Sequence, residues 1–521
     1  MTLDELLGNP ELVQKMIDEY QNQQNNDATA QSDSATDPAA APQCTIAGIM
    51  RDNLDWIQGS GLFNAEQIKA AQMIGVCKTS RLGGVIQYCP DCKRPVSFQY
   101  RSCNNRNCPY CQFPLQKKWV ELRKSEAIPG TPYYHVILTV PHLLNPLILE
   151  NQKVLLDVLF QSTSKSILEM CQDERILGAK PGFFTTLHSW SSDMNFHFHT
   201  HTVLSGGGLN DAGVYVNLID LRKEQAQKSA KAENDASVLT DEEAANRSFD
   251  YFMPVVALTD LFRGKYMDAL KKLYDANKLQ FPAELDYLSD PHEWSTFCGK
   301  LYQTKWVGKL VRTCGVGENA VGVLAQYCNR LPGQNITFCQ ESSLLGSDSS
   351  SSTSIIDISD ATNGSYGDAF DYLSRYVFHT ALTDNRLLDY DTQSVSFLAR
   401  DPENGNMSRK VTYPVHRFIQ LFLGHILPKG YTRVRFYGFL ACGQKKRCLN
   451  IIFMQVTGAP FEYSELKQMH GLPLMQKLFP KAKYGICPDC GGALVCIPFD
   501  KARKYDASAR ARARARSAPA A

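Results

Sequence analysis

Apolar positions between residues 131 and 209 fall into runs that predict strands and one long helix. The run "YYHVILTVP" is typical of a buried strand, and the apolar residues of "LNPLILENQKVLLDVLFQSTSKSILEMCQ" recur at helical spacing. The runs "GFFTTLHSW" and "NFHFHTHTVLSGGGL" then predict two more strands, the second closed by glycines. This order of elements predicts a compact unit of the α+β class.

Helical patterns recur elsewhere, and polar segments separate them. Residues 1–20 predict a short amphipathic helix, and apolar residues recur at helical spacing in "GDAFDYLSRYVFHTAL" and "VHRFIQLFLGHILP". Polar stretches of small residues follow residue 20 and begin again at Lys223 and Glu341, as in linkers and insertions. The tail "ARARARARSAPAA" predicts a basic disordered appendage.

Composition places the chain among globular proteins of a reducing compartment. At 521 residues it is too long for one hydrophobic core, so we expect roughly two to four domains. The N-terminus lacks the basic and apolar regions of a signal peptide, and polar residues or prolines interrupt the best apolar run. Seventeen cysteines in such a chain predict thiols or metal ligands rather than disulfides. We therefore expect a cytoplasmic protein without a membrane partner.

The net charge of +2 hides a strongly basic window. No acidic residue lies between Glu403 and Glu462, which predicts a surface for nucleic-acid phosphates. The candidate DNA-binding residues of this window are Arg409, Lys410, Arg417, Lys429, Arg433 and Arg435.

Two CxxC pairs predict a zinc site. Cys89 with Cys92 and Cys108 with Cys111 have the spacing of two knuckles that converge on one tetrahedral Zn²⁺. Cys77 and Cys103 lie nearby, and we expect buried thiols there, with a role as alternative ligands left open. Cys487 and Cys490 form one further knuckle, a candidate second zinc site whose partners would come from Cys442, Cys448 or Cys496.

Histidines at alternate positions predict a second kind of metal site. His197, His199 and His201 project from one face if their segment is a strand, because side chains alternate along a strand. Three imidazoles on one face can hold a divalent cation. The residue types alone leave the reaction open.

Two tyrosines supply a candidate nucleophile. Tyr372 and Tyr376 stand four apart, so a helix presents both hydroxyls on one face. A tyrosine can attack a phosphodiester and keep the bond as a reversible phosphotyrosine ester. Such chemistry needs no nucleotide, and the chain has no GxxxxGK[ST] loop.

From about Cys77 to Ala441 the chain resembles the rolling-circle insertion-sequence transposases of the two-tyrosine "IS ninety-one" (IS91) family, in the HUH endonuclease superfamily. The motifs that carry the resemblance are "GGVIQYCPDC", "SCNNRNCPYCQ", "YYHVILTVPHLLNP", "HFHTHTVLSGGGL", "FRGKYMDALK", "YLSRYVFHTALTDNRL" and "FIQLFLGHILPKGYTRVRFYGFLA".

The resemblance implies a transposase that nicks one DNA strand and becomes joined to its 5′ phosphate. His199 and His201 would hold Mg²⁺ or Mn²⁺, with His197 as a third ligand or a neighbour of the ligands, and Tyr372 and Tyr376 would be the nucleophiles. The partners would be single-stranded DNA, transposon-end hairpins and target DNA, in a bacterial nucleoid-associated setting. The fold would be an HUH-type antiparallel sheet with flanking helices, plus an N-terminal zinc-binding module and linkers.

The implied division of the chain follows these motifs. Its parts are an N-terminal helix and linker (1–45), a zinc-binding, DNA-contacting module (46–128), the HUH metal-binding part (129–221), a charged insertion (222–250), a helical part (251–340), a Ser-rich insertion (341–368), the tyrosine helix with the basic part (369–460), a C-terminal region (461–500) and the basic tail (501–521).

Alternatives remain at each level. The metal pair would be His197 with His199 if Phe198 is the hydrophobic residue between the ligands, and Tyr327 is a rival nucleophile that lacks a partner tyrosine four residues earlier. A plasmid or phage rolling-circle replication initiator would use the same chemistry. A non-catalytic zinc-ribbon DNA-binding protein would keep the histidines for structure alone.

Overall fold

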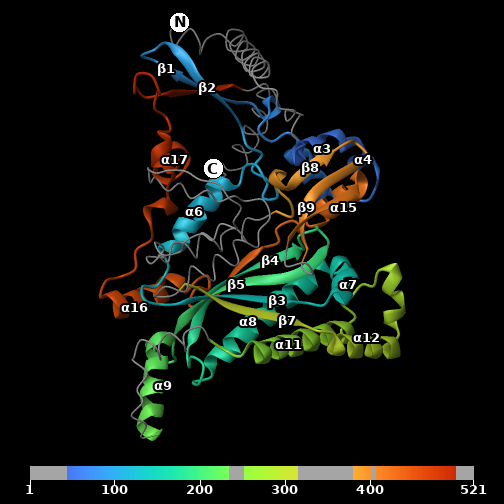
Figure 1. Ribbon diagram of the computed structural model, residues 1–521, viewed down its shortest axis with the longest axis vertical. Helices are drawn as coiled ribbons and strands as arrows, with labels where there is room; N and C mark the ends of the chain where they lie inside the picture. The colour runs from blue at the N-terminus through green and yellow to red at the C-terminus, as the bar shows by residue number, and fades with distance from the viewer. Residues whose placement is uncertain (1–43, 234–251, 315–379, 402–406, 500–521) are drawn as a thin grey trace, which may run out of the picture.

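The computed structural model describes residues 44–233, 252–314, 380–401 and 407–499. Figure 1 shows a large sheet lined by long helices at one end of the molecule and a small sheet at the other. A helical module and a third sheet lie between them. All paired strands are antiparallel, so the α+β prediction is confirmed.

The large sheet is built from strands far apart in the sequence. Its order is β11-β4-β5-β3-β7, with β6 added beside β5. The strands are β3 (Tyr133–Thr139), β4 (Lys180–Trp190), β5 (Phe196–Leu209), β6 (Tyr215–Asn217), β7 (Val307–Cys314) and β11 (Val434–Gly438). β3, β4 and β5 match the predicted strands. β7 and β11 join the same sheet, although they come from the predicted helical part (251–340) and the predicted basic part (369–460).

One short helix and three longer ones cover one face of this sheet. They are α7 (Asn145–Glu150), α8 (Gln152–Gln172), α11 (Val255–Asp275) and α12 (Pro291–Gln303). Leu138, Phe198 and Leu204 point toward them and share one hydrophobic core with residues of α8 and α11. The hydroxyls of Thr163 on α8 and Thr200 on β5 lie 3.2 Å apart, which fixes the even-numbered positions of β5 on the helix side. The alternating odd-numbered positions therefore face the other way.

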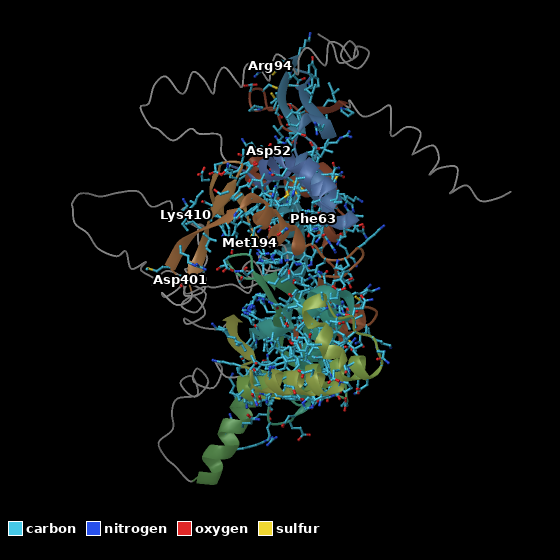
Figure 2. The ribbon with its side chains drawn as sticks, turned by 90° about the vertical axis from the view of Figure 1, so that its right-hand side faces the viewer. Asp52, Phe63, Arg94, Met194, Asp401 and Lys410 are labelled. Atoms are coloured by element: carbon cyan, nitrogen blue, oxygen red, sulfur yellow. The ribbon has the colours of Figure 1, made fainter. Side chains whose placement is uncertain are left out.

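The helical module brings the first helices of the described chain together with residues 380–424. It contains α3 (Ile46–Asp52), α4 (Leu54–Gly59), α5 (Ala65–Gly75), α15 (Val415–Gly424) and a sheet of β8 (Leu387–Tyr390), β9 (Ser394–Asp401) and β10 (Met407–Pro414). Asn64 caps α5 with a reciprocal capping box, and one core joins Ile49 and Ile74 to Phe397 and Phe418. Figure 2 shows Asp52 in this module and Lys410 on the β9–β10 hairpin that projects from it.

The small sheet stands at the far end, where Figure 2 labels Arg94. Its order is β12-β1-β2, from β1 (Gly84–Cys89), β2 (Arg94–Tyr100) and β12 (Val495–Phe499). The remaining helices are α6 (Phe113–Lys124), α9 (Leu218–Glu233), α16 (Lys445–Thr457) and α17 (Gly471–Leu478). Residues 460–499, which we call the C-terminal strap, run from α16 past α6 to the small sheet (Figure 1).

Several predicted elements have a definite outcome. The predicted helix in residues 415–428 is confirmed as α15. The segment from Lys223, predicted as an insertion, begins with the end of α9. The predicted helices of residues 1–20 and of the tyrosine segment lie outside the described residues. Within the described ranges, no helix is both long enough and apolar enough to cross a bilayer.

Candidate metal centres

The face of the large sheet that is turned away from α8 and α11 carries histidines from three strands. His199 on β5 pairs in register with His188 on β4, and His201 pairs with Ile137, two residues from His135 on β3. Directly paired residues share a face of the sheet. The odd-numbered positions of β5 and their partners therefore present imidazoles together.

His188, His199 and His201 form a compact group, which we call the histidine cluster. Their ligating nitrogens lie within 4.8 Å of one another, and all three side chains are buried. The Nε2 atoms of His199 and His201 are 3.0 Å apart. Three converging imidazoles without a carboxylate form a nitrogen donor set for a divalent metal.

Hydrogen bonds orient two of these rings. Nδ1 of His199 donates to the backbone oxygen of His197 at 2.8 Å, which leaves Nε2 with its lone pair. Nδ1 of His201 lies 2.8 Å from Nε2 of His135, so His201 also directs Nε2 toward the cluster when it donates to His135. Burial lowers the pKa of His199 and of His135 to about 3, so both are neutral at neutral pH. A neutral imidazole is the form that binds a metal.

His197 lies beside the cluster, and its ring pairs with another residue. Its Nδ1 is 2.7 Å from Nε2 of His142. The structure thus brings together His199 and His201, the pair expected to hold the metal. The third ring of the cluster belongs to His188 and not to His197, which was expected as a third ligand or a neighbour of the ligands. The sequence analysis did not select His188, because its place beside His199 depends on how two strands pair. A histidine within "TTLHSW", on a predicted strand, was the one signal that could have indicated it.

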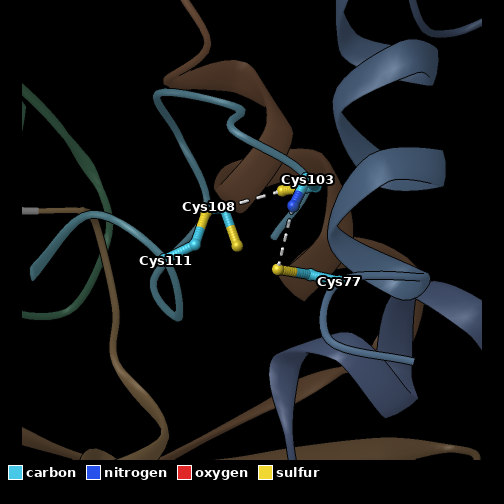
Figure 3. Close-up of side chains that lie close together, drawn as sticks. All are labelled: Cys77, Cys103, Cys108 and Cys111. Atoms are coloured by element: carbon cyan, nitrogen blue, oxygen red, sulfur yellow. Dashed lines mark hydrogen bonds between the residues drawn. The ribbon is translucent and has the colours of Figure 1, made fainter. Parts of the chain in front are cut away.

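Four buried cysteines form the first cysteine cluster, shown in Figure 3: Cys77, Cys103, Cys108 and Cys111. The sulfurs of Cys103 and Cys111 are 3.7 Å apart, and the backbone N–H of Cys103 donates to Cys77 at 3.5 Å. Cys77 follows α5, and Cys108 and Cys111 precede α6, so the cluster ties the helical module to the loop before α6.

A second cysteine cluster lies in the small sheet. It consists of Cys89, Cys92, Cys487 and Cys490, whose sulfurs also lie within 4.8 Å of one another. The predicted grouping of Cys89 and Cys92 with Cys108 and Cys111 is therefore wrong, because each pair has nearer partners. Cys77 and Cys103, expected as simple buried thiols, complete the first cluster. Neither cluster contains the expected partners of Cys487, which were Cys442, Cys448 or Cys496.

Residues from several segments of the chain line a small hollow next to Trp190, whose ring contacts the histidine cluster. Its lining includes Ser189, Trp190, Thr380, His425 and Arg433. The ring of Trp190 stacks on that of His188, with 4.8 Å between centroids. The guanidinium of Arg433 lies 4.8 Å from the centroid of the Trp190 ring.

Arg106 connects the first cysteine cluster to the same hollow. It lies in the loop between Cys103 and Cys108, and its guanidinium donates to the backbone oxygens of Leu427, Pro428 and Tyr431 at 2.6 to 3.2 Å. The cysteine cluster therefore fixes a loop that packs against the chain leading to β11. A metal that stiffens this loop would also stiffen one wall of the hollow.

The residues of the basic window separate into two groups. Arg409, Lys410, Arg417 and Lys429 are exposed, and Arg409 makes an ion pair of 3.4 Å with Asp193. Arg433 is partly buried over Trp190. Arg435 is placed differently: it pairs with Asp157 and lies 4.2 Å from the Phe160 ring centroid on α8. The prediction of an exposed DNA contact does not fit Arg435, because strand alternation turns it to the helix side.

The candidate nucleophiles Tyr372 and Tyr376, and the rival Tyr327, lie outside the described residues. The description of the chain resumes at Thr380, four residues after Tyr376, and Thr380 and Ala381 line the hollow beside Trp190.

Comparisons with known proteins identify relatives for most of the chain. The family model described as "Transposase zinc-binding domain" matches residues 49–140, and the one described as "Putative transposase" matches 182–232, 235–345 and 334–448. The chain is 27% identical over 435 residues to the "Putative transposase y4qJ" of Sinorhizobium fredii, covering 81% of this chain and 87% of that protein.

A second relative is the "Transposase for insertion sequence element IS801" of Pseudomonas savastanoi pv. phaseolicola. It is 29% identical over 185 residues, which cover 35% of this chain and 43% of that protein. No solved structure matches the chain.

Proposed function

Because the chain belongs to the IS91 family of transposases, we propose that it nicks single-stranded DNA at the ends of a mobile element and transfers the strand by rolling-circle transposition. The observation that carries this proposal is the histidine cluster. Two rings on one strand and a third on its neighbour bring their nitrogens within 4.8 Å of one another, on the face of the sheet turned away from α8 and α11. Packing alone gives no reason to bury three converging imidazoles.

The donor set of the cluster fits a divalent metal. His188, His199 and His201 would hold it, and the bound ion would polarise the scissile phosphate and stabilise charge on its oxygens. Mg²⁺ prefers oxygen ligands, whereas imidazole suits first-row transition metals. The three nitrogens therefore favour Mn²⁺ over Mg²⁺.

Tyr372 and Tyr376 are the proposed nucleophiles. The hydroxyl oxygen of one tyrosine attacks the phosphorus, the bond from phosphorus to the 3′ oxygen breaks, and a 5′-phosphotyrosine and a free 3′-hydroxyl result. Attack by the 3′-hydroxyl of a target strand reverses this step and releases the tyrosine.

The exposed basic residues around β10 and α15 support DNA as the partner. Arg409, Lys410 and Arg417 project from the same part of the helical module, and Arg433 with Trp190 continues this basic character into the hollow. We propose that single-stranded DNA, including the hairpins of element ends, and the target strand bind here.

The proposal is tested by replacing the cluster histidines. His199→Ala/His201→Ala removes two nitrogen ligands and should slow cleavage of a single-stranded oligonucleotide at least about 100-fold, the size of a principal electrostatic contribution. Binding of the oligonucleotide should persist, because the basic surface is unchanged. Cleavage at the wild-type rate would refute the metal role of the cluster. Wild-type protein that binds the oligonucleotide and never cleaves it would instead favour the non-catalytic zinc-ribbon DNA-binding protein.

His197→Ala is the matched control. Its ring pairs with His142 outside the cluster, and its backbone oxygen, which orients His199, survives the substitution. A smaller loss than that of His199→Ala is expected. An equal loss from His197→Ala, with His201→Ala nearly silent, would move the metal to His197 and His199.

A further inference from the structure

The same tetrapeptide, Cys-Pro-Asp-Cys, occurs at residues 89–92 and at residues 487–490. The residue after each copy adopts a left-handed backbone conformation, with φ of 54° at Lys93 and 74° at Gly491. A backbone N–H donates to a cysteine sulfur in both turns, from Cys92 to Cys89 at 3.4 Å and from Gly492 to Cys490 at 3.4 Å. The two turns thus share their sequence and the left-handed residue that follows it, and one sulfur in each accepts a backbone N–H, the first cysteine in one turn and the second in the other.

The two turns face each other across the small sheet. The sulfurs of Cys89 and Cys490 are 3.5 Å apart, and those of Cys92 and Cys487 are 3.9 Å apart. A tetrahedral Zn²⁺ with zinc–sulfur bonds of about 2.3 Å requires sulfur–sulfur distances of about 3.8 Å. A disulfide requires about 2.05 Å, so the spacing fits a shared metal and excludes a bond between the sulfurs.

The surroundings bring the turns close together. A side chain at Gly492 would collide with Asp91 of the other turn, because a Cβ atom there would lie 2.1 Å from the Asp91 carboxylate. Arg94, two residues after the first turn, makes an ion pair with Asp489 in the second. The close approach of the two turns therefore depends on residues outside the four cysteines as well.

We propose that Cys89, Cys92, Cys487 and Cys490 bind a structural Zn²⁺ that fastens the C-terminal strap to the hairpin of β1 and β2. This site is separate from the first cysteine cluster and from the histidine cluster. The cysteines of one turn come from the segment matched as a zinc-binding domain, and those of the other lie beyond residue 448, where the family matches end. The zinc would close the chain on itself over roughly 400 residues, since the paired cysteines are 395 and 401 positions apart.

The end of the strap is the edge strand β12, which pairs with β1 and buries few side chains. Among residues 480–498, only Cys487 and Ile497 are buried. Earlier parts of the strap are attached to α6, where Lys118 donates to the backbone oxygen of Met469 at 2.8 Å and Phe113 stacks on Phe479. Because this edge strand buries a single apolar side chain besides its ladder with β1, we expect the metal to add a large share of the stability of this end.

The metal content of the full-length protein tests the proposal. Cobalt substituted for zinc gives a thiolate charge-transfer absorption that reports only cysteine sites, so metal at the histidine cluster does not contribute. Wild type should show the absorption of two four-thiolate sites. Cys487→Ser/Cys490→Ser should lose half of it and one equivalent of zinc. Cys89→Ser/Cys92→Ser, which removes the two ligands of the other turn, should also lose half of the absorption and one equivalent of zinc.

Cys496→Ser is the matched control, because Cys496 is an exposed thiol on β12 outside the cluster. It should retain both sites. In the two double variants a protease should cut the strap near its end much faster than in wild type, while the half of the absorption that belongs to the first cluster shows that the remaining protein is folded.

Two results would overturn the proposal. One is an unchanged zinc content and cobalt spectrum in both double variants. The other is wild-type protein, kept under reductant, with the absorption of a single four-thiolate site.

Discussion

His135 holds the ring of His201 in the orientation that the histidine cluster requires. Nε2 of His135 lies 2.8 Å from Nδ1 of His201, and the two rings are stacked with an interplanar angle of 18°. His135 comes from β3 and His201 from β5, so the pairing of these strands sets the contact. A partner on Nδ1 fixes which nitrogen of a ligand histidine is available to a metal.

We predict that His135→Ala weakens binding of Mn²⁺ by about 10- to 100-fold, the usual effect of removing a hydrogen-bond partner of a ligand histidine. His135→Asn should restore part of the affinity, since the amide oxygen can accept the same hydrogen bond. Titration calorimetry of protein without DNA measures this directly. His142→Ala, which removes the partner of His197, should bind as wild type, and equal affinity in His135→Ala would contradict the assignment.

We predict that Cys77→Ser removes the zinc of the first cysteine cluster, although Cys77 belongs to no CxxC pair. Serine is a poor zinc ligand, and structural zinc contributes on the order of 10 kcal/mol to folding. The variant should have one equivalent of zinc less than wild type and a lower melting temperature of the helical module. Cys44→Ser, a change in the same module outside the cluster, should keep its zinc. Full zinc content in Cys77→Ser would show that three cysteines suffice.

DNA binding should depend on salt through the exposed residues of the basic window. For single-stranded DNA each neutralised phosphate contributes about 0.7 to the slope of log affinity against log salt. Arg409→Gln/Lys410→Gln/Arg417→Gln should therefore lower the slope by about 2. Lys272→Gln on α11, across the sheet from the histidine cluster, is the control and should leave the slope unchanged. A slope that is the same in the triple variant and wild type would place the DNA elsewhere.

Stability should fall with acid because His425 is buried in its neutral form. It donates from Nε2 to Met194 at 2.9 Å, and burial lowers its pKa to about 4. An unfolded histidine has a pKa near 6.5, so between pH 6.5 and 4 the unfolded state binds the extra proton and folding is disfavoured. The loss from this residue is roughly 2 kcal/mol between pH 7 and pH 5.

His425→Gln keeps a donor for Met194 and cannot titrate. Urea unfolding at pH 7 and pH 5 should therefore show a smaller loss of stability in this variant than in wild type. Other buried histidines and the cysteine sites titrate in both proteins, so the difference between the two losses isolates His425. Equal losses would mean that this ring is charged or exposed in the folded state.

The local part of the fold could be predicted from the sequence, whereas the pairings across it could not. Apolar periodicity predicted β3, α8, β4 and β5, because the spacing of apolar residues within each segment reflects which of its own side chains are buried. The addition of β7 and β11 to the same sheet depends on contacts between distant segments, which periodicity does not encode.

The same limit explains the metal centres. Alternation placed His199 and His201 on one face, but His188 joins them only through the register of β4 with β5. CxxC spacing identified knuckles without choosing their partners, and the nearest pair in sequence was the wrong choice. Cys92 meets Cys487 395 positions away, a contact that only the folded chain reveals.

Formation of a covalent protein–DNA adduct tests the central claim most directly. Wild type incubated with Mn²⁺ and an oligonucleotide from an element end should give an adduct that survives denaturant, with the DNA on a peptide that contains Tyr372 or Tyr376. Tyr372→Phe/Tyr376→Phe should abolish the adduct and leave DNA binding intact, because phenylalanine keeps the ring and loses only the nucleophilic oxygen. An adduct that persists in this variant and disappears in Tyr327→Phe would contradict the account.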